Sequence, residues 1–462
     1  MPDIYAIYGG GSGHATRVEP TLQRSSRAVH WELVRTAKYS HYGVPRAIPP
    51  EETVRRVKPL LSAAGITRVA EVTHLDRLGI PNFVAVRPRD RGSEISYYNG
   101  KGCTVAQARA SAIMEAFERY SGEHWVEPVV CATYNGILRS GPAVDPREIL
   151  VPALQPYHDD LVLEWVCGYD LIQQAPTFVP LNSVVCPYIP GGGEALYFSS
   201  TNGLAAGNTL LEALCQALCE VLERDAESMT LAAVGLRASV EAVIGTLGAQ
   251  LPAPYPPTHH RLISPEGMPR PARCLLERIR RSGLRAYVRD LTCTTGIPTI
   301  DCAISERLAD GTQRVHGGFG THPDARVALI RALTEAAQSR VACIQGGRED
   351  LPEITAHVRP PDPEETYRNG EVVPFSSLPS FEHHHIDDDV REILRAMRQD
   401  GLEQAVALDM TQPELSIPVV RVVVPKAETW ATFHMHTGRG KFGPRVARQL
   451  LKGKTDGRGD AL

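Results

Sequence analysis

The stretch Gly100-Lys-Gly-Cys-Thr104 leads into a helical segment that ends Ser111-Ala-Ile-Met-Glu115-Ala-Phe-Glu118-Arg119. Further along the chain, Gly203-Leu-Ala-Ala-Gly207-Asn208-Thr209 leads into a second helical segment that ends Glu220-Val-Leu-Glu223-Arg224. The Thr precedes the first Glu by the same interval in both copies, so the two helices superpose without a gap. Residues three apart lie on one face of a helix, and each copy therefore presents two carboxylates together.

A third copy is looser. Gly320-Thr321 precedes a helical stretch that contains Glu335, Gln338 and Arg340. The interval from Thr321 to Glu335 is longer by three residues than the matching interval in the other copies. The sequence therefore predicts a third helix that is related to the first two but not in register with them.

Each of these helices is preceded by a Thr that is followed three residues later by Gln107, Glu212 or Asp324. This spacing is typical of a capping box and predicts helix N-caps at Thr104, Thr209 and Thr321. The glycines before the caps are not explained by capping. Glycine at a helix N-terminus also lets backbone N–H groups approach phosphate oxygens, so both a structural and a phosphate-binding interpretation stay open.

Paired β-rich segments frame the helices, and in three of the four pairs an Ile-Pro precedes the second segment. They are residues 69–73 with 83–86, 287–292 with 300–304, 406–411 with 419–424, and a weaker pair, 165–170 with 178–180. Pro at the entry to a strand is tolerated because its missing N–H does least harm there. We predict an α+β fold of repeated strand–strand–helix units, with antiparallel sheet and the three motif helices gathered on one side.

Composition limits the class of protein. The chain has 462 residues and a net charge of −4, which gives no broad basic field for nucleic acid. The N-terminus lacks the layout of a signal peptide, and no apolar run approaches the roughly 18 residues of a membrane helix. The ten cysteines are scattered, as expected for reduced thiols. We therefore expect a cytoplasmic protein that binds neither nucleic acid nor membrane.

The repeat also predicts the domain organisation. Residues 1–55 have no counterpart in it and form an N-terminal arm of unknown role, residues 56–445 form one domain, and residues 446–462 form a basic, flexible tail. Segments 252–272 and 352–380 are too rich in proline for regular structure and are interpreted as surface insertions.

Four further patterns have weaker chemical interpretations. Cys215 and Cys219 resemble half a metal site, but we favour small core residues of a buried helix. Residues 383–385 (three His) and 387–389 (three Asp) are interpreted as a solvated helix start that favours acidic residues. His434 and His436 are interpreted as structural, and the glycine run at residues 9–13 lacks the following helix that a phosphate loop needs.

The carboxylates point to a metal. Glu115, Glu118, Glu220 and Glu223 come from two helices that the fold places side by side, next to apolar residues. Like charges brought together in such a place repel and lose solvation unless a cation joins them, and Mg²⁺ binds carboxylates together with nucleotide oxygens. The alternative is solvated pairs with the neighbouring arginines. Such pairs stabilise only weakly and need not recur at one register, so we favour the metal.

In these motifs the chain resembles the YcaO family over roughly residues 60–445. The resemblance implies an enzyme that uses ATP and Mg²⁺ to phosphorylate and expel a backbone amide oxygen of a peptide or protein when a nucleophile attacks. It implies a YcaO-like fold with the motif helices around an ATP site. By position, Ser111, Glu115, Asn208, Glu212, Arg224, Gln338 and Arg340 would bind the nucleotide, and Glu115, Glu118, Glu220 and Glu223 would bind Mg²⁺. Glu335 lies in the third motif without an assigned role.

Two details suggest a branch of the family. The last residues lack the Pro-x-Pro-x-Pro pattern usual in azoline-forming members, and residues 65–81 and 417–425 resemble members paired with TfuA proteins. That branch is linked to thioamide formation with exogenous sulfide, and we expect a TfuA-like partner and a homodimer as further assemblies. The alternatives are an azoline- or amidine-forming cyclodehydratase of a ribosomal peptide pathway, and a nucleotide-bound accessory protein without chemistry of its own.

Overall fold

Antiparallel hairpins occur at the four places where the sequence predicts them. The structure is a computed structural model that describes residues 31–41, 44–88, 95–125, 127–233, 246, 261–348, 370–432 and 442–451. The paired strands are β3 (Arg68–Glu71) with β4 (Asn82–Val86), β7 (Leu163–Asp170) with β8 (Ala175–Pro180), β11 (Arg285–Asp290) with β12 (Thr299–Arg307), and β15 (Val406–Asp409) with β16 (Val419–Val423). The α+β prediction is therefore confirmed.

The hairpins belong to three separate sheets. One has the order β3-β4-β5, with β5 at Tyr97–Lys101. A six-stranded sheet has the order β6-β7-β15-β16-β9, with β8 also paired to β7; β6 is Val130–Ala132 and β9 is Leu204–Ala206. A five-stranded sheet has the order β13-β12-β11-β10-β14, with β13 at Gln313–Thr321. A small hairpin, β1 (Tyr39–His41) with β2 (Val44–Arg46), lies in the N-terminal arm.

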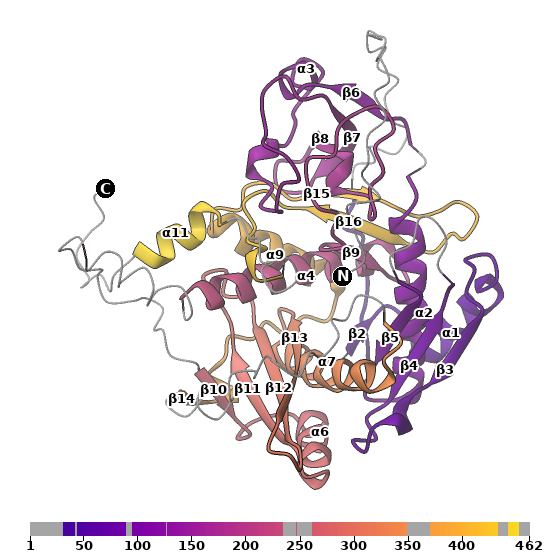
Figure 1. The fold of residues 1–462 in the computed structure, drawn as a ribbon, viewed down its shortest axis with the longest axis vertical. Helices are drawn as coiled ribbons and strands as arrows, with labels where there is room; N and C mark the ends of the chain where they lie inside the picture. The colour runs from indigo at the N-terminus through magenta and orange to yellow at the C-terminus, as the bar shows by residue number, and fades with distance from the viewer. Residues whose placement is uncertain are drawn as a thin grey trace.

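Each sheet carries one motif helix. α2 (Val105–Gly122) packs on β4 and β5, α4 (Leu210–Leu231) on β9 and β16, and α7 (Ala325–Gln345) on β12 and β13. Each helix also touches the strand that precedes another motif helix, because α2 contacts β9, α4 contacts β13 and α7 contacts β5. The three units therefore close on one another in a ring, and Figure 1 shows α2, α4 and α7 around the middle of the molecule.

Close packing of strand against helix explains the glycines that precede the motif helices. A Cβ on Gly100 would lie 2.1 Å from the backbone nitrogen of Ala112, and a Cβ on Gly320 would lie 2.1 Å from the carbonyl oxygen of Ala328. A Cβ on Gly207 would lie 2.5 Å from the nitrogen of Ala213. No side chain fits at such distances. Packing alone is thus a sufficient reason for these glycines, without a phosphate contact.

The two proline-rich segments are more regular than predicted. Within them, β10 (Arg261–Ser264) and β14 (Glu371–Pro374) pair in parallel and extend the five-stranded sheet, and α6 (Arg270–Arg281) begins at the end of the first segment. The prediction of insertions without regular structure is wrong for these residues. Local composition missed them because β14 gains its partner β10 from a distant segment, and β10 lies between β14 and β11.

The remaining helices pack around these units. They are α1 (Pro50–Val57), α3 (Tyr134–Ile137), α9 (Ile386–Gln399) and α11 (Pro444–Leu451). Because α11 is helical and Val446 is buried, the prediction of a flexible tail from residue 446 is wrong for the part that the structure describes. None of the described helices is long and apolar enough to cross a membrane. Residues 9–14, 434 and 436 lie outside the described residues.

Candidate functional site: an acidic cavity among three helices

The N-caps of the motif helices set a common register. The hydroxyl of Thr104 accepts a hydrogen bond from the nitrogen of Gln107 (3.2 Å), and that of Thr209 accepts one from Glu212 (3.1 Å), as predicted. The cap of α7 is Asp324 instead of Thr321, because β13 continues through Thr321 and His322 precedes a proline that disfavours the helical conformation. The predicted cap at Thr321 is therefore wrong.

This correction brings the third helix into register. The interval from cap to first carboxylate is eleven residues in each copy: 104 to 115, 209 to 220 and 324 to 335. Gln338 then occupies the position of Glu118 and Glu223. The prediction that the third helix is out of register is wrong, because it took Thr321 as the N-cap in place of Asp324.

A cavity of about 390 Å³ lies where the three helices meet, and it gathers nearly all the predicted site residues. The predicted residues that line it are Ser111, Glu115, Glu118, Asn208, Glu212, Glu220, Glu223, Arg224 and Gln338. They come from segments far apart in the sequence, and the ring of α2, α4 and α7 brings them together. Their chemical roles remain predictions.

Arg340 is the predicted residue that the structure places elsewhere. It stands sixteen residues after its cap, in the position of Asp225 in the second copy, and it does not line the cavity. Its guanidinium instead pairs with Asp76 (3.0 Å) and Glu306 (2.6 Å) in a largely buried network. The nucleotide-binding role that the resemblance implies for Arg340 stays a prediction, and the position of this side chain suits a link between the first and third units.

At one end of the cavity, which we call the α2–α4 end, acids predominate. Glu115 and Glu118 face Glu220 across the two helices, and the pKa of Glu118 is raised well above its usual value by burial and by these two charges. Burial also raises the pKa of Glu220. One oxygen of Glu118 accepts the Ala206 N–H (3.0 Å), which orients the carboxylate. Arg119 contacts Glu115 (3.4 Å) but leaves the group with an excess of negative charge.

The opposite end, which we call the α4–α7 end, contains more bases. Burial alone would raise the pKa of Glu335. The positive charges of Lys101, which forms an ion pair with Glu335, and of Arg224 outweigh burial and lower this pKa. Burial and the charge of Glu335 raise the pKa of Glu223 to about 7. Arg331 donates to Gln216 across α4 and α7.

Asn208 and Glu212 join α4 to the N-terminal arm. The Asn208 amide donates to Glu212 (2.9 Å) and accepts from the hydroxyl of Thr53 (2.9 Å). The other Glu212 oxygen accepts the Ala47 N–H (2.8 Å). The Glu212 carboxylate therefore has a structural role beyond the predicted capping and nucleotide binding, because it fixes the arm against the cavity. Sequence reasoning assigned the arm no role.

Sequence reasoning also missed several cavity residues. Lys101 and Arg331 line the cavity, as do Tyr39, Arg46 and Ile48 of the arm. A signal existed for Arg331, which lies four residues before Glu335 and so faces the same side of α7. Lys101 stands between the two motif glycines. The arm residues gave no signal, since they belong to no repeat.

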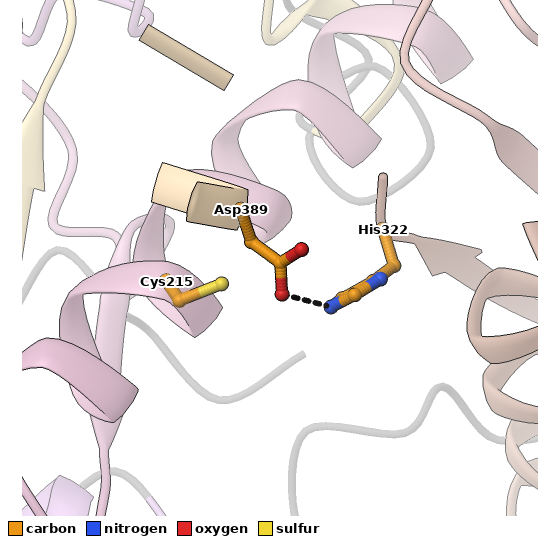
Figure 2. A group of neighbouring side chains, drawn as sticks. All are labelled: Cys215, His322 and Asp389. Carbon is orange, nitrogen blue, oxygen red and sulfur yellow. Dashed lines mark ion pairs between the residues drawn. The ribbon is translucent and has the colours of Figure 1, made fainter. Parts of the chain in front are cut away.

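A second polar cluster lies outside the cavity. Figure 2 shows Cys215 of α4, His322 after β13 and Asp389 of α9 converging, with the His322 Nε2 atom 3.4 Å from Asp389. The Nδ1 atom of His322 accepts the Asp324 N–H (3.0 Å), so the ring proton of a neutral His322 lies on Nε2. Lys38 already neutralises Asp389 at 2.6 Å. A metal would have to displace Lys38 and the protons of the Cys215 thiol and the His322 ring, so the ion pairs of Asp389 with Lys38 and His322 explain this cluster better.

The same cluster corrects the interpretation of the His–Asp run. Acidic residues do occupy the first turn of α9, as predicted. However, Asp387 and Asp389 are buried rather than solvated, and Asp387 accepts the Thr36 N–H (3.1 Å). Cys215 and Cys219 are core residues, as predicted.

The chain belongs to the YcaO family. The family model described as YcaO cyclodehydratase, ATP- and Mg²⁺-binding, matches residues 99–428. A protein of Methanothermobacter thermautotrophicus described only as uncharacterized is 35% identical over 410 residues, which cover 86% of this chain and 98% of that protein. A Rhizobium leguminosarum protein described as lying in the tfuA 3′ region is 30% identical over 397 residues, 83% of this chain and 88% of that one.

A solved structure agrees with the family. The structure of YcaO from Methanopyrus kandleri bound with AMPPCP and Mg²⁺ matches with a TM-score of 0.65 and 26% identity, and covers 88% of this chain and 98% of that one. ATP and Mg²⁺ are therefore the cofactors of this family, and the cavity fits them. Glu118, Glu220 and Glu223 stand on adjacent helices with raised pKa values, and the buried Glu223 Oε2 accepts no hydrogen bond from the described residues. A divalent cation removes that deficit.

Proposed function

We propose that this protein uses ATP to activate a backbone amide of a peptide or protein for thioamide formation. The observation that carries the proposal is the convergence of three in-register helices on one cavity with an acid-rich end and a base-rich end. Acids suit Mg²⁺ and bases suit phosphate, so the two ends together match the Mg–nucleotide complex. A protein that only bound a partner would not require so many charges turned toward one cavity.

The proposed roles follow the two ends. Glu115, Glu118, Glu220 and Glu223 hold Mg²⁺, which neutralises phosphate charge when bound. Ser111, Asn208, Glu212, Arg224 and Gln338 hold the nucleotide. The amide oxygen attacks the terminal phosphorus of ATP and ADP leaves. Sulfide then adds to the amide carbon, and phosphate departs with the original oxygen.

Support for sulfide as the nucleophile comes from the Rhizobium relative, whose description places it beside tfuA. The same description supports a TfuA-like partner protein as part of the proposal. A cyclodehydratase is the second candidate function, favoured by the description of the family model. In that reaction a Cys, Ser or Thr side chain of the substrate attacks the same activated amide. The two reactions share the ATP site and differ only in the source of the nucleophile.

The product distinguishes these functions. The protein is incubated with ATP, Mg²⁺, sodium sulfide, a candidate substrate peptide and a TfuA-like protein. Thioamide formation gives a sulfide-dependent product that is heavier by the difference between sulfur and oxygen. A product lighter by one water, made equally well without sulfide, would replace the thioamide proposal with the cyclodehydratase. ATP binding without any turnover of ATP or peptide would favour an accessory protein.

A further inference from the structure

The segment that ends the described chain is anchored in the interior. In Figure 1, α11 lies beside α4, at the end of α4 that points away from α2. Arg445, in the first turn of α11, is 4% exposed and forms short ion pairs with Asp225 of α4 and with Asp400, the residue that ends α9. Asp225 is fully buried. One guanidinium therefore holds three helices together through two separate nitrogens.

The approach to α11 is equally fixed. Buried Glu428 accepts the N–H groups of Gly443 (2.9 Å) and Val446 (3.1 Å), so a side chain from another part of the chain satisfies the start of the helix. A Cβ on Gly443 would lie 2.2 Å from Leu150 and 2.6 Å from Glu428. The position of this segment is therefore fixed by the Glu428 carboxylate and by the ion pairs of Arg445.

These contacts act on the turn of α4 that carries the cavity residues. Asp225 directly follows Arg224, and its Oδ1 atom also accepts the Glu428 N–H (2.8 Å). Ser228 donates to the carbonyl of Arg224 (2.8 Å) and accepts the Ala431 N–H (3.1 Å). The C-terminal residues therefore hold the turn of α4 that directly follows Glu223 and Arg224, two residues that line the α4–α7 end of the cavity.

We propose that Arg445 is a positioning residue for the Mg–nucleotide site, acting through Asp225 on Glu223 and Arg224. Without the guanidinium, the Asp225 carboxylate is a buried charge with no close cation, and relieving it requires water entry or a shift of α4. Either change moves two cavity side chains whose orientation the nucleotide complex needs. The inference rests on ATP and Mg²⁺ binding, not on the thioamide proposal.

The test compares three variants by titration calorimetry with AMPPCP in MgCl₂, well below their melting temperatures. Arg445→Met removes the charge. Arg445→Lys keeps a charge but cannot bind Asp225 and Asp400 through separate nitrogens. Arg448→Met alters an exposed residue one turn along the same helix and is the matched control. We expect nucleotide affinity to fall about tenfold in Arg445→Met and less in Arg445→Lys, because residues that orient ligand-binding side chains have effects of this size. The affinity of Arg448→Met should equal that of the wild type.

Wild-type affinity in both Arg445 variants, even with lowered melting temperatures, would overturn the inference and leave α11 a purely structural element. If Arg445→Met does not fold, Arg445→Lys decides between the same outcomes. A wild-type protein that binds no AMPPCP would remove the nucleotide site itself and the inference with it. The wild-type titration therefore distinguishes the absence of a nucleotide site from the absence of a positioning role for Arg445.

Discussion

The α2–α4 and α4–α7 ends of the cavity arise from the same repeated helix but differ in charge. At the α2–α4 end, Glu115, Glu118 and Glu220 outnumber the basic contacts. At the α4–α7 end, Gln338 stands where the first two helices have a second Glu, and Lys101 pairs with Glu335. Equivalent backbone positions thus create one end with an excess of acids and one end with more positive charge.

The repeat determines where the side chains point, while residues of neighbouring strands determine what those side chains can bind. Lys101 comes from β5, which belongs to the first unit, yet it neutralises an acid of the third. Gln338 donates to the Asn99 carbonyl on the same strand (2.6 Å) and so closes the ring at that point. We therefore propose that the metal binds mainly at the α2–α4 end and the phosphates mainly at the α4–α7 end.

The largest expected effect tests the α2–α4 end. Glu220→Gln keeps the shape of the side chain but removes a charge that Mg²⁺ needs, so we expect substrate-dependent ATP hydrolysis to fall about 100-fold or more while the fold survives. Glu277→Gln, at an exposed acid of α6, is the control. Glu335→Gln should have a smaller effect on the Mg²⁺ dependence, since Lys101 already neutralises that acid. If Glu220→Gln and Glu335→Gln changed ATP hydrolysis and its Mg²⁺ dependence equally, the proposed difference between the two ends of the cavity would be wrong.

The hairpins, motif helices and most cavity residues could be predicted because each rests on local periodicity repeated along the chain. Errors arose where one contact from a distant segment decided the outcome. Thr321 has the spacing of a cap, but it lies in β13 and its hydroxyl donates to Thr299. Arg340 has the chemistry of a phosphate ligand, but Asp76 and Glu306 hold it elsewhere. The arm could not be placed, because its partners Glu212 and Asp387 are far along the chain.

A second prediction measures how completely the α4–α7 end is neutralised. The pKa of Glu223 is raised to about 7, so the native state binds this proton more tightly than the unfolded chain, whose Glu has a pKa near 4.5. The contribution of Glu223 to stability without nucleotide therefore falls as pH rises from about 4.5 to 7 and then levels off. We expect Glu223→Gln to be more stable than wild type by on the order of 2 kcal/mol at pH 8, with little difference at pH 4.5. Urea denaturation at both pH values measures this. A variant less stable than wild type at pH 8 would mean that nearby bases already neutralise Glu223.

A third prediction concerns the phosphate side. Lys101→Met retains length and removes the charge, so we expect AMPPCP affinity to fall about tenfold, with the Mg²⁺ concentration for half-maximal binding nearly unchanged. Lys101→Arg should restore most of the affinity. If Lys101→Met instead alters the Mg²⁺ requirement and not the nucleotide affinity, the two ends have been assigned the wrong way round.

The smallest effect separates two neighbours at the start of α4. The hydroxyl of Thr209 accepts the Glu212 N–H as a helix cap, and Thr209→Ala should therefore lower the free energy of unfolding by about 1 kcal/mol without weakening nucleotide binding. Thr104→Ala, at the equivalent cap of α2, should cost a similar amount. Asn208 lines the cavity and orients the Glu212 carboxylate, so Asn208→Ala should chiefly weaken AMPPCP binding. Denaturation and calorimetry on the same samples compare the two effects. A large loss of stability with normal nucleotide affinity in Asn208→Ala would exchange these roles, because the amide would then serve only to hold the arm through Thr53.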